Sequence, residues 1–171
     1  FVSLFDNQMV MTIGDIKVDW QNDIIYVGSG ENNSSRSSYS GNGIYKSVDN
    51  GKSWDNIGLQ ESHHIGRIII HPQNPDIIWV ASLGHLYSSS NERGVYKSLD
   101  GGLTWTNKLY VNDYTGAIDL VIDENNPEIL YASMWEKDRK AWNFDGSGVG
   151  SGIYKSIDGG EYWVEISARQ V

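Results

Sequence analysis

Cysteine is absent from this 171-residue sequence, and basic side chains are scarce. Without cysteine there is no disulfide, a condition met by exported bacterial β-proteins as well as by cytosolic proteins. The 13 Lys and Arg are outnumbered by 22 Asp and Glu, and the formal net charge is −9. Nucleic acids and anionic membranes repel such a surface, so neither is expected as a partner. No stretch is long and apolar enough to span a bilayer, and none shows sustained helical periodicity.

A repeated motif, S-x-D-x-G-x-x-W, is the most prominent feature that is present. It occurs at residues 47–54, 98–105 and 156–163, each time directly after a G-[IV]-Y-K segment. The motif serines lie 51 and 58 residues apart. Repeats of roughly 40–50 residues that contain several short strands are typical of propeller blades.

Each repeat also contains two mostly apolar strand segments before the motif. The first of these are residues 16–19, 68–71 and 120–123, and the second are residues 24–27, 77–80 and 129–132. Together with the G-[IV]-Y-K strand and a last strand opened by the tryptophan, they give four antiparallel strands per unit. The sequence therefore predicts an all-β fold, a β-propeller segment of three complete four-stranded antiparallel blades plus the outer strand of a preceding blade. The predicted boundaries are 1–11 for that outer strand and 12–60, 61–111 and 112–171 for the blades, all within one incomplete propeller domain.

The motif has a structural explanation. Its glycine supplies the positive φ of a hairpin loop, its serine and aspartate bond to the backbone of the turn, and its tryptophan folds beneath the hairpin. Catalysis or calcium binding by the aspartates is disfavoured, because the turns are alike in all three units and the spacing differs from that of a calcium-binding EF loop. The residues expected in this structural role are Ser47, Asp49, Gly51, Trp54, Ser98, Asp100, Gly102, Trp105, Ser156, Asp158, Gly160 and Trp163.

The motif is similar to the Asp-box (BNR) repeats of sialidases, sortilin-type receptors and some propeller glycoside hydrolases. The chain as a whole resembles the bacterial sortilin-like proteins, many of which are described as glycosyl hydrolases. The resemblance extends beyond the motif to residues 28–31 (GSGE), 64–67 (HIGR), 83–87 (LGHLY), 92–94 (ERG) and 142–146 (WNFDG). It implies a propeller that either recognises a peptide or glycan or hydrolyses a glycan. Sialidase activity is disfavoured, because the Arg-Ile-Pro segment of sialidases is absent from this sequence.

Alternating strand directions sort the connections onto two ends of the blades. The short turns and the motif hairpins share one end, and the long, variable connections at residues 31–42, 83–93 and 136–151 share the other, which we call the loop face. Function is expected on the loop face, since binding residues concentrate on variable loops held by a rigid scaffold. The candidate ligand-binding residues are Arg36, Tyr39, His64, Arg67, His85, Tyr87, Arg93, Arg139, Trp142 and Phe144.

Structural roles compete with ligand binding for most of these residues. Three arginines, at 36, 93 and 139, come from equivalent loops and could converge on an anionic group. Arg93 follows Glu92, however, and an ion pair that braces the loop is the alternative. The aromatic rings at 142 and 144 could stack on a sugar or could cover the edge of a blade.

The candidate catalytic carboxylates are Glu31, Asp15, Asp119 and Glu136. A glycoside hydrolase needs two carboxyl groups about 5–5.5 Å or 6.5–9.5 Å apart, which the sequence does not fix. Asp15, Arg67 and Asp119 occupy equivalent positions on the inner strands, and pairing between them is favoured over ligand binding.

Metal binding by His63, His64 and His85 is disfavoured, because no HxH pattern or close carboxylate accompanies them. No metal and no cofactor is therefore expected. Three blades cannot close a ring that usually needs about four to eight, so the remaining blades of a larger protein or a second copy are expected as partners. The sequence predicts an extracytoplasmic recognition propeller, either secreted, periplasmic or at the cell surface, although no signal peptide is present in this segment. A glycoside hydrolase that uses two loop-face carboxylates is the alternative.

Overall fold

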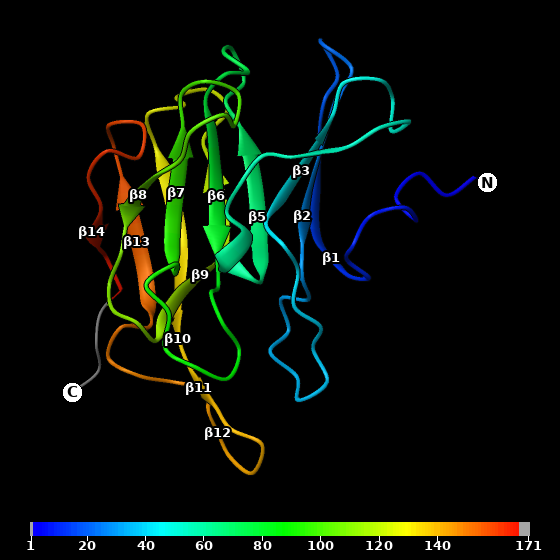
Figure 1. Cartoon of the computed structure of the whole chain (residues 1–171). Coiled ribbons are helices and arrows are strands. Elements are labelled where there is room, and N and C mark those ends of the chain that lie inside the picture. Colours follow the sequence, from blue (N-terminus) through cyan, green and yellow to red (C-terminus); the bar gives the residue numbers. More distant parts are fainter. Residues whose placement is uncertain (1, 168–171) are drawn as a thin grey trace.

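Three four-stranded antiparallel sheets make up the computed structural model, which describes residues 2–167 (Figure 1). The first sheet contains β1 (Ile13–Asp19), β2 (Ile24–Ser29), β3 (Ile44–Ser47) and β4 (Asp55–Asn56). The second contains β5 (Ile65–Ile70), β6 (Ile78–Ser82), β7 (Gly94–Ser98) and β8 (Thr106–Leu109). The third contains β9 (Thr115–Ile122), β10 (Leu130–Glu136), β13 (Gly152–Ser156) and β14 (Val164–Glu165). The strands of each sheet are ordered as in the chain, which confirms the predicted all-β propeller fold.

The innermost strands β1, β5 and β9 begin earlier than predicted and lie close to one another. Each sheet has one bulge in the pairing of its first two strands, at residues 14, 66 and 118. A Cβ on Gly14 would lie 2.0 Å from the main-chain oxygen of Ile65, and a Cβ on Gly66 would lie 2.2 Å from that of Ile118. These neighbouring blades can approach this closely because glycine occupies the bulge of the first and second blades, whereas Ile118 occupies that of the third.

Two hydrophobic clusters fill the spaces between the sheets. One joins the first and second sheets around Tyr26, Ile65 and Ile78, and the other joins the second and third around Trp79 and Leu130. Trp79 is 1% exposed, and its Nε1 donates to the main-chain oxygen of Gly159 in the third blade. The core therefore lies between blades, and each blade depends on its neighbour for burial.

The lysine of the G-[IV]-Y-K strand also connects blades. Lys46 Nζ donates to the main-chain oxygen of Gly101 at 3.0 Å, and Lys97 Nζ donates to that of Gly159 at 2.7 Å. Each of these glycines belongs to the S-x-D-x-G-x-x-W turn of the following blade. The lysine thus bonds to a turn that lies more than fifty residues further along the chain.

The S-x-D-x-G-x-x-W turns are closed by side-chain hydrogen bonds in the way the motif predicts. Ser47 Oγ donates to Asp49 Oδ1 at 2.8 Å and accepts from the amide of Gly51 at 2.8 Å. The same two bonds recur in the second and third turns. The motif glycines at 51, 102 and 160 all have positive φ, between 81° and 94°. The serine, aspartate and glycine of the motif therefore stabilise the conformation of the turn.

Within residues 2–11, the described part of the predicted outer strand at 1–11, no strand is formed. Residues 2–12 make turns and bends, although the oxygen of Thr12 accepts a hydrogen bond of 3.0 Å from the amide of Gly30. Leu4 nevertheless occupies the place against Trp54 and Gly51 that Ile57 occupies against the second motif turn. The ends of the predicted first and last segments, residues 1 and 168–171, lie outside the described residues.

Two small elements on the loop face were not predicted. A 3₁₀ turn, η1 (Gln60–Ser62), precedes β5, and a hairpin of β11 (Asp138–Arg139) and β12 (Phe144–Asp145) projects from the third blade. Within residues 2–167, no helix reaches the length and apolarity that a membrane crossing requires.

Candidate functional site

The long connections and the motif turns lie at opposite ends of the blades. Figure 1 shows the β11–β12 hairpin and the other long loops at the lower end of the sheets and the motif hairpins at the upper end. This arrangement follows from the antiparallel order of the strands. The loop face is therefore a distinct surface, to which each blade contributes one long loop.

A charged row crosses the three inner strands at the level of the bulges. Arg67 Nε lies 2.6 Å from Asp119 Oδ1, and Arg67 Nη1 lies 3.4 Å from Asp15 Oδ1. Asp15 Oδ2 also accepts a hydrogen bond of 2.7 Å from the amide of Ile68. Asp119 raises the pKa of the Arg67 guanidinium, and Asp15 acts in the same direction. One guanidinium therefore joins the inner strands of all three blades, and both of these candidate catalytic carboxylates are occupied by it.

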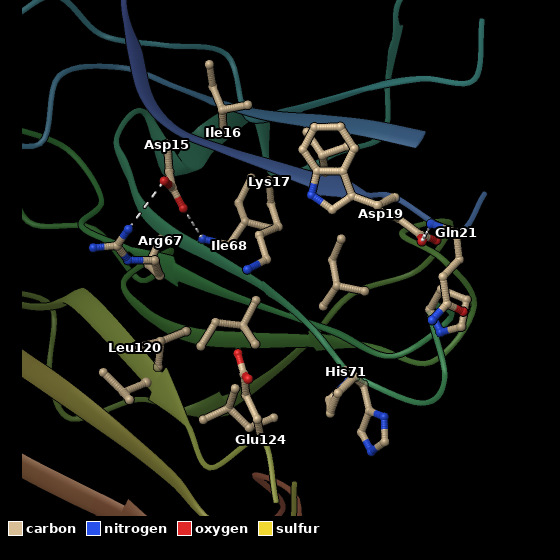
Figure 2. Close-up of a pocket in the computed structure, with 18 residues that line it drawn as sticks. Asp15, Ile16, Lys17, Asp19, Gln21, Arg67, Ile68, His71, Leu120 and Glu124 are labelled. Atoms are coloured by element: carbon tan, nitrogen blue, oxygen red, sulfur yellow. Dashed lines mark hydrogen bonds and ion pairs between the residues drawn. The ribbon is translucent and has the colours of Figure 1, made fainter. Parts of the chain in front are cut away.

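A hollow of about 510 Å³ extends from this row along the inner strands toward the end of the blades that carries the motif turns (Figure 2). At the end of the hollow farthest from the charged row, polar side chains form hydrogen bonds within local turns. Asp19 Oδ1 accepts from the amide of Gln21 at 3.0 Å, and His71 Nδ1 accepts from the amide of Gln73 at 3.1 Å. The hollow therefore combines apolar strand side chains with polar and charged groups. Asp15, Arg67 and Asp19 already bond within the chain, and Lys17 and Glu124 also line it.

Arg93 lies beneath the loop of its own blade and is 1% exposed. Its Nη1 donates to the oxygen of Leu83 at 2.6 Å, and its Nη2 donates to that of His85 at 2.7 Å. The expected ion pair with Glu92 is not the brace, because Glu92 Oε2 instead accepts a hydrogen bond of 2.8 Å from the Tyr96 hydroxyl. Burial lowers the pKa of Arg93 to about 10. Arg93 therefore holds the loop through backbone carbonyls and does not contribute to an open anion site.

Lys137 and His64 lie close to Arg93 and are buried, at 2% and 3% exposure. Among residues 2–167, neither Lys137 Nζ nor His64 Nδ1 has a hydrogen-bond partner. Burial, with a further contribution from the charge of Arg93, lowers the pKa of Lys137 to about 7. Burial and the charge of Lys137 lower the pKa of His64 to about 4. Sequence reasoning did not identify Lys137, since a lysine just after a strand is normally exposed.

The β11–β12 hairpin is held together by stacked side chains. The guanidinium of Arg139 lies 4.7 Å from the centre of the Phe144 ring, which packs edge-on against Trp135 with 5.9 Å between the ring centres. Trp135 Nε1 donates to the oxygen of Gly146 at 2.8 Å. Trp142 lies in the loop of the hairpin and is 85% exposed. The base of the hairpin is thus held in place by these contacts, and its loop exposes the indole ring of Trp142 to solvent.

Two of the three predicted arginines meet beside this hairpin. Arg36 from the first blade and Arg139 from the third line one depression of about 310 Å³, together with Trp142 and Phe144. The Tyr87 hydroxyl donates to the main-chain oxygen of Arg36 at 2.6 Å and so ties the loop of the first blade to that of the second. This depression is built from loops of different blades, which the sequence could not place together.

Two further candidate carboxylates, Glu136 and Glu31, lie on the loop face and take part in local contacts. Glu136 Oε2 accepts from the amide of Gly150 at 2.6 Å, and so holds the end of the hairpin loop. The amide of Glu31 donates to the oxygen of Tyr39 at 3.2 Å, and the ring of Tyr39 is exposed. Within the described residues, every carboxyl pKa that is clearly shifted is lowered: Asp49, Asp100, Asp158 and Glu161. A glycosidase acid needs a raised pKa.

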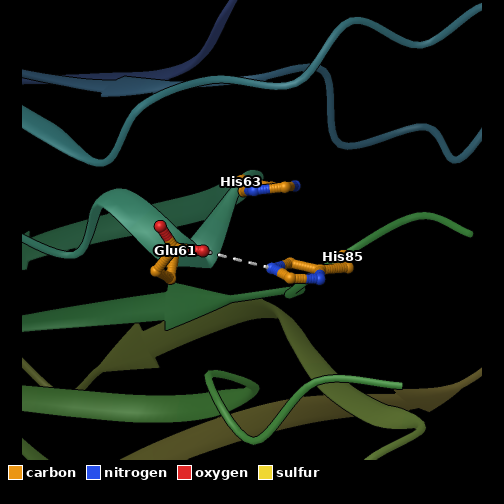
Figure 3. A group of neighbouring side chains, drawn as sticks. All are labelled: Glu61, His63 and His85. Carbon is orange, nitrogen blue, oxygen red and sulfur yellow. Dashed lines mark ion pairs between the residues drawn. The ribbon is translucent and has the colours of Figure 1, made fainter. Parts of the chain in front are cut away.

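Histidines 63 and 85 come together with Glu61 (Figure 3). The imidazole rings stack with centres 3.9 Å apart, and His85 Nε2 lies 3.7 Å from Glu61 Oε2. Burial and the neighbouring His85 lower the pKa of His63. The expectation that no carboxylate lies close to these histidines is therefore wrong. Glu61 precedes His63 by two residues, but the sequence does not show that His85, 24 residues after Glu61, lies beside both.

Comparison with known proteins supports the fold. No family model and no curated protein matches the chain. Its structure is similar to the GH74 xyloglucanase from Xanthomonas campestris, with a TM-score of 0.61 and 17% identity over 96% of this chain and 25% of that one. It is also similar to an ancestral GH74 enzyme (TM-score 0.55, 16% identity, 94% of this chain and 25% of that one) and to the GH74 enzyme from Niastella koreensis (TM-score 0.52, 16% identity, 90% and 29%). The chain thus spans about a quarter of the length of these β-propeller glycoside hydrolases, and the likeness concerns the fold.

Proposed function

We propose that the chain is part of a recognition propeller that binds a glycan on its loop face without cleaving it. The observation that carries this proposal is the depression between Arg36 and Arg139, with Trp142 exposed at its edge and Phe144 in its wall. An exposed aromatic ring offers an apolar face on which a sugar ring can stack. Two guanidinium groups beside it can donate hydrogen bonds to hydroxyl or carboxylate oxygens.

Rigidity of the surrounding loops favours binding. The base of the hairpin is fixed by Trp135, Phe144 and the Gly146 carbonyl, so the ring of Trp142 is presented on a supported loop. A site that is already formed loses less conformational entropy when a ligand binds. Tyr39 and Tyr87 are 54% and 51% exposed on neighbouring loops and could extend the aromatic surface along a glycan chain.

Glycan hydrolysis is the second candidate, favoured by the likeness of fold to GH74 enzymes. The side-chain arrangement argues against it. Asp15 and Asp119 share the Arg67 guanidinium, and Glu136 accepts hydrogen bonds from its own hairpin loop. In both roles the carboxylate oxygens already accept structural hydrogen bonds, whereas a glycoside hydrolase needs two carboxyl groups free to face the glycosidic bond. A glycan ligand would also place the protein outside the cytoplasm, where structural polysaccharides are found.

The test uses xyloglucan oligosaccharides and a wider glycan array, with binding measured by calorimetry and hydrolysis measured by release of reducing ends. We expect binding without hydrolysis, and a loss of affinity of about fivefold or more in Trp142→Ala, since stacking on an aromatic ring contributes on the order of 1 kcal/mol or more. Tyr162→Ala is the matched control, because Tyr162 is 80% exposed and belongs to a motif turn at the opposite end of the blades.

Three kinds of result would overturn the proposal. If no glycan binds, or if Trp142→Ala binds as the wild type does, the loop-face depression is not the site. If reducing ends are released and Glu31→Gln or Glu136→Gln abolishes their release, the protein is a glycoside hydrolase. Binding of peptides in place of glycans would make it a peptide receptor.

A further inference from the structure

We propose that Glu61, His63 and His85 form a binding site for a divalent transition-metal ion such as Zn²⁺ on the loop face. Each residue offers one ligand atom, and these atoms all lie within 4.8 Å of one another. Figure 3 shows the two imidazole rings side by side with the carboxylate directed at His85. The proposal is independent of glycan binding, because none of these residues lines the depression at Trp142.

The backbone before β5 is shaped so that Glu61 and His63 project together. Leu59 and His63, which flank η1, have positive φ values of 57° and 56°. Non-glycine residues adopt this region at an energetic cost, which the surrounding structure must offset. The hydroxyl of Ser62 donates to the oxygen of Leu59 at 2.6 Å and closes the turn. A strained and locked turn of this kind is commonly found where side chains must be held for a function.

His85 is held from two sides. Its Nδ1 lies 3.0 Å from Ser88 Oγ, and its main-chain oxygen accepts from Arg93 Nη2 at 2.7 Å. The remaining ring nitrogen, Nε2, is buried and has no hydrogen-bond partner within the described residues. Glu61 Oε2 is its nearest charged neighbour at 3.7 Å, which is beyond hydrogen-bonding distance. A second hydrogen bond that orients a histidine is the usual support of a metal ligand.

The donor set indicates which metal would fit. Two imidazole nitrogens and one carboxylate oxygen match Zn²⁺ and similar transition metals, whereas Ca²⁺ and Mg²⁺ prefer oxygen ligands. Zinc–ligand bonds of about 2.0–2.2 Å place tetrahedral ligand atoms about 3.3–3.5 Å apart, so the site must contract on binding. The side chain of Glu61 is 74% exposed and can close by changing its rotamer.

A fourth coordination position would remain open to solvent. His85 lines two depressions, one of about 260 Å³ with His63 and Tyr87 and one of about 370 Å³ with Glu61 and Asp113. Three protein ligands and an accessible fourth position distinguish exchangeable or catalytic zinc sites from closed structural ones. The bound ion would therefore be able to take a water molecule or an oxygen or nitrogen ligand from solution.

The test is a calorimetric titration of the untagged protein with Zn²⁺ alone, supported by the visible spectrum of the Co²⁺ form. We expect one ion per chain and the spectrum of a four-coordinate Co²⁺ site. His85→Gln should abolish binding, Glu61→Gln should weaken it by about tenfold or more, and Ser88→Ala should weaken it by about 10–100-fold through loss of the second hydrogen bond.

His71→Asp is the matched control, because it removes a histidine at the opposite end of the blade while keeping the acceptor of the turn. Asp19 and Asp123 already play that role in the other two blades. If the wild type binds no Zn²⁺ at micromolar protein concentration, or if Glu61→Gln and His71→Asp bind equally, the proposal is wrong. Should His85→Gln fail to fold by circular dichroism, the exposed Glu61 decides the question.

Discussion

The indole Nε1 of Trp105 donates a hydrogen bond of 2.8 Å to the main-chain oxygen of Ile57, so the motif turn of the second blade is fastened to the outer strand end of the first. Trp54 makes the equivalent bond to Leu4 at 2.7 Å, whereas Trp163 bonds to Gly160 within its own turn at 3.1 Å. The sequence predicted that the motif tryptophan folds beneath its own hairpin. In the first two copies its polar atom instead connects to the chain segment that precedes the blade.

Replacing Trp105 with Phe tests this connection. The ring remains but the donor is lost, so we expect the free energy of unfolding to fall by about 1 kcal/mol, the usual contribution of one hydrogen bond. Urea unfolding followed by circular dichroism measures the change. Trp142→Phe is the control, since that ring is 85% exposed. Equal stability of the two variants would show that the bond to Ile57 does not hold the blades together.

Arg67→Gln tests the charged row across the inner strands. The two aspartates would lose their common partner, and we expect the free energy of unfolding to fall by about 1 kcal/mol at low ionic strength. The side chains of Arg67 and Asp119 are 44% and 45% exposed, so salt should screen the effect. Urea unfolding at low and high ionic strength measures it. A loss of stability that does not depend on salt would contradict an electrostatic role.

The aspartates of the motif turns should make the fold sensitive to acid. Hydrogen bonds from the hydroxyl and the amide of Thr104 lower the pKa of Asp100 from 3.8 to about 2. A carboxyl whose folded pKa is depressed stabilises the protein above its unfolded pKa, and this contribution is lost as the pH falls from about 4 to about 2. We expect Asp100→Asn to be less stable at neutral pH and to lose less stability on acidification. Thermal unfolding across this pH range measures both effects, and the exposed Asp55→Asn in β4 should behave as the wild type does.

Lys137 should make stability rise with pH on the alkaline side. Its folded pKa is about 7, whereas an unfolded lysine titrates near 10.5, so between these values the unfolded chain binds a proton that the folded chain does not. Stability should therefore increase from pH 7 toward pH 10. Lys137→Met should remove this slope and raise the free energy of unfolding at pH 7 by on the order of 1–3 kcal/mol, because no buried charge has to form. An unchanged slope in the variant would place its origin at another group.

Much of the candidate site depends on contacts that no local pattern encodes. Arg36 and Arg139 are 103 residues apart and meet only because the loops of the first and third blades project from the same end of the sheets. Arg93 comes from the equivalent loop but is buried, and its guanidinium donates to the main-chain oxygens of Leu83 and His85 in that loop. Arginines at equivalent positions of the repeat thus differ in burial and in contacts, according to the loops that surround them.

The sequence by itself determined the repeating unit and its turns. The bonds that close each motif turn join residues no more than four positions apart, such as Ser47 and Gly51, and the motif glycine adopts its positive φ without a Cβ clash. Only the tertiary structure decided which blade a motif tryptophan or lysine contacts, how deeply Lys137 is buried, and that Glu61 faces His85. These relationships arise from the packing of separate blades, which sets distances between residues that are far apart in the chain.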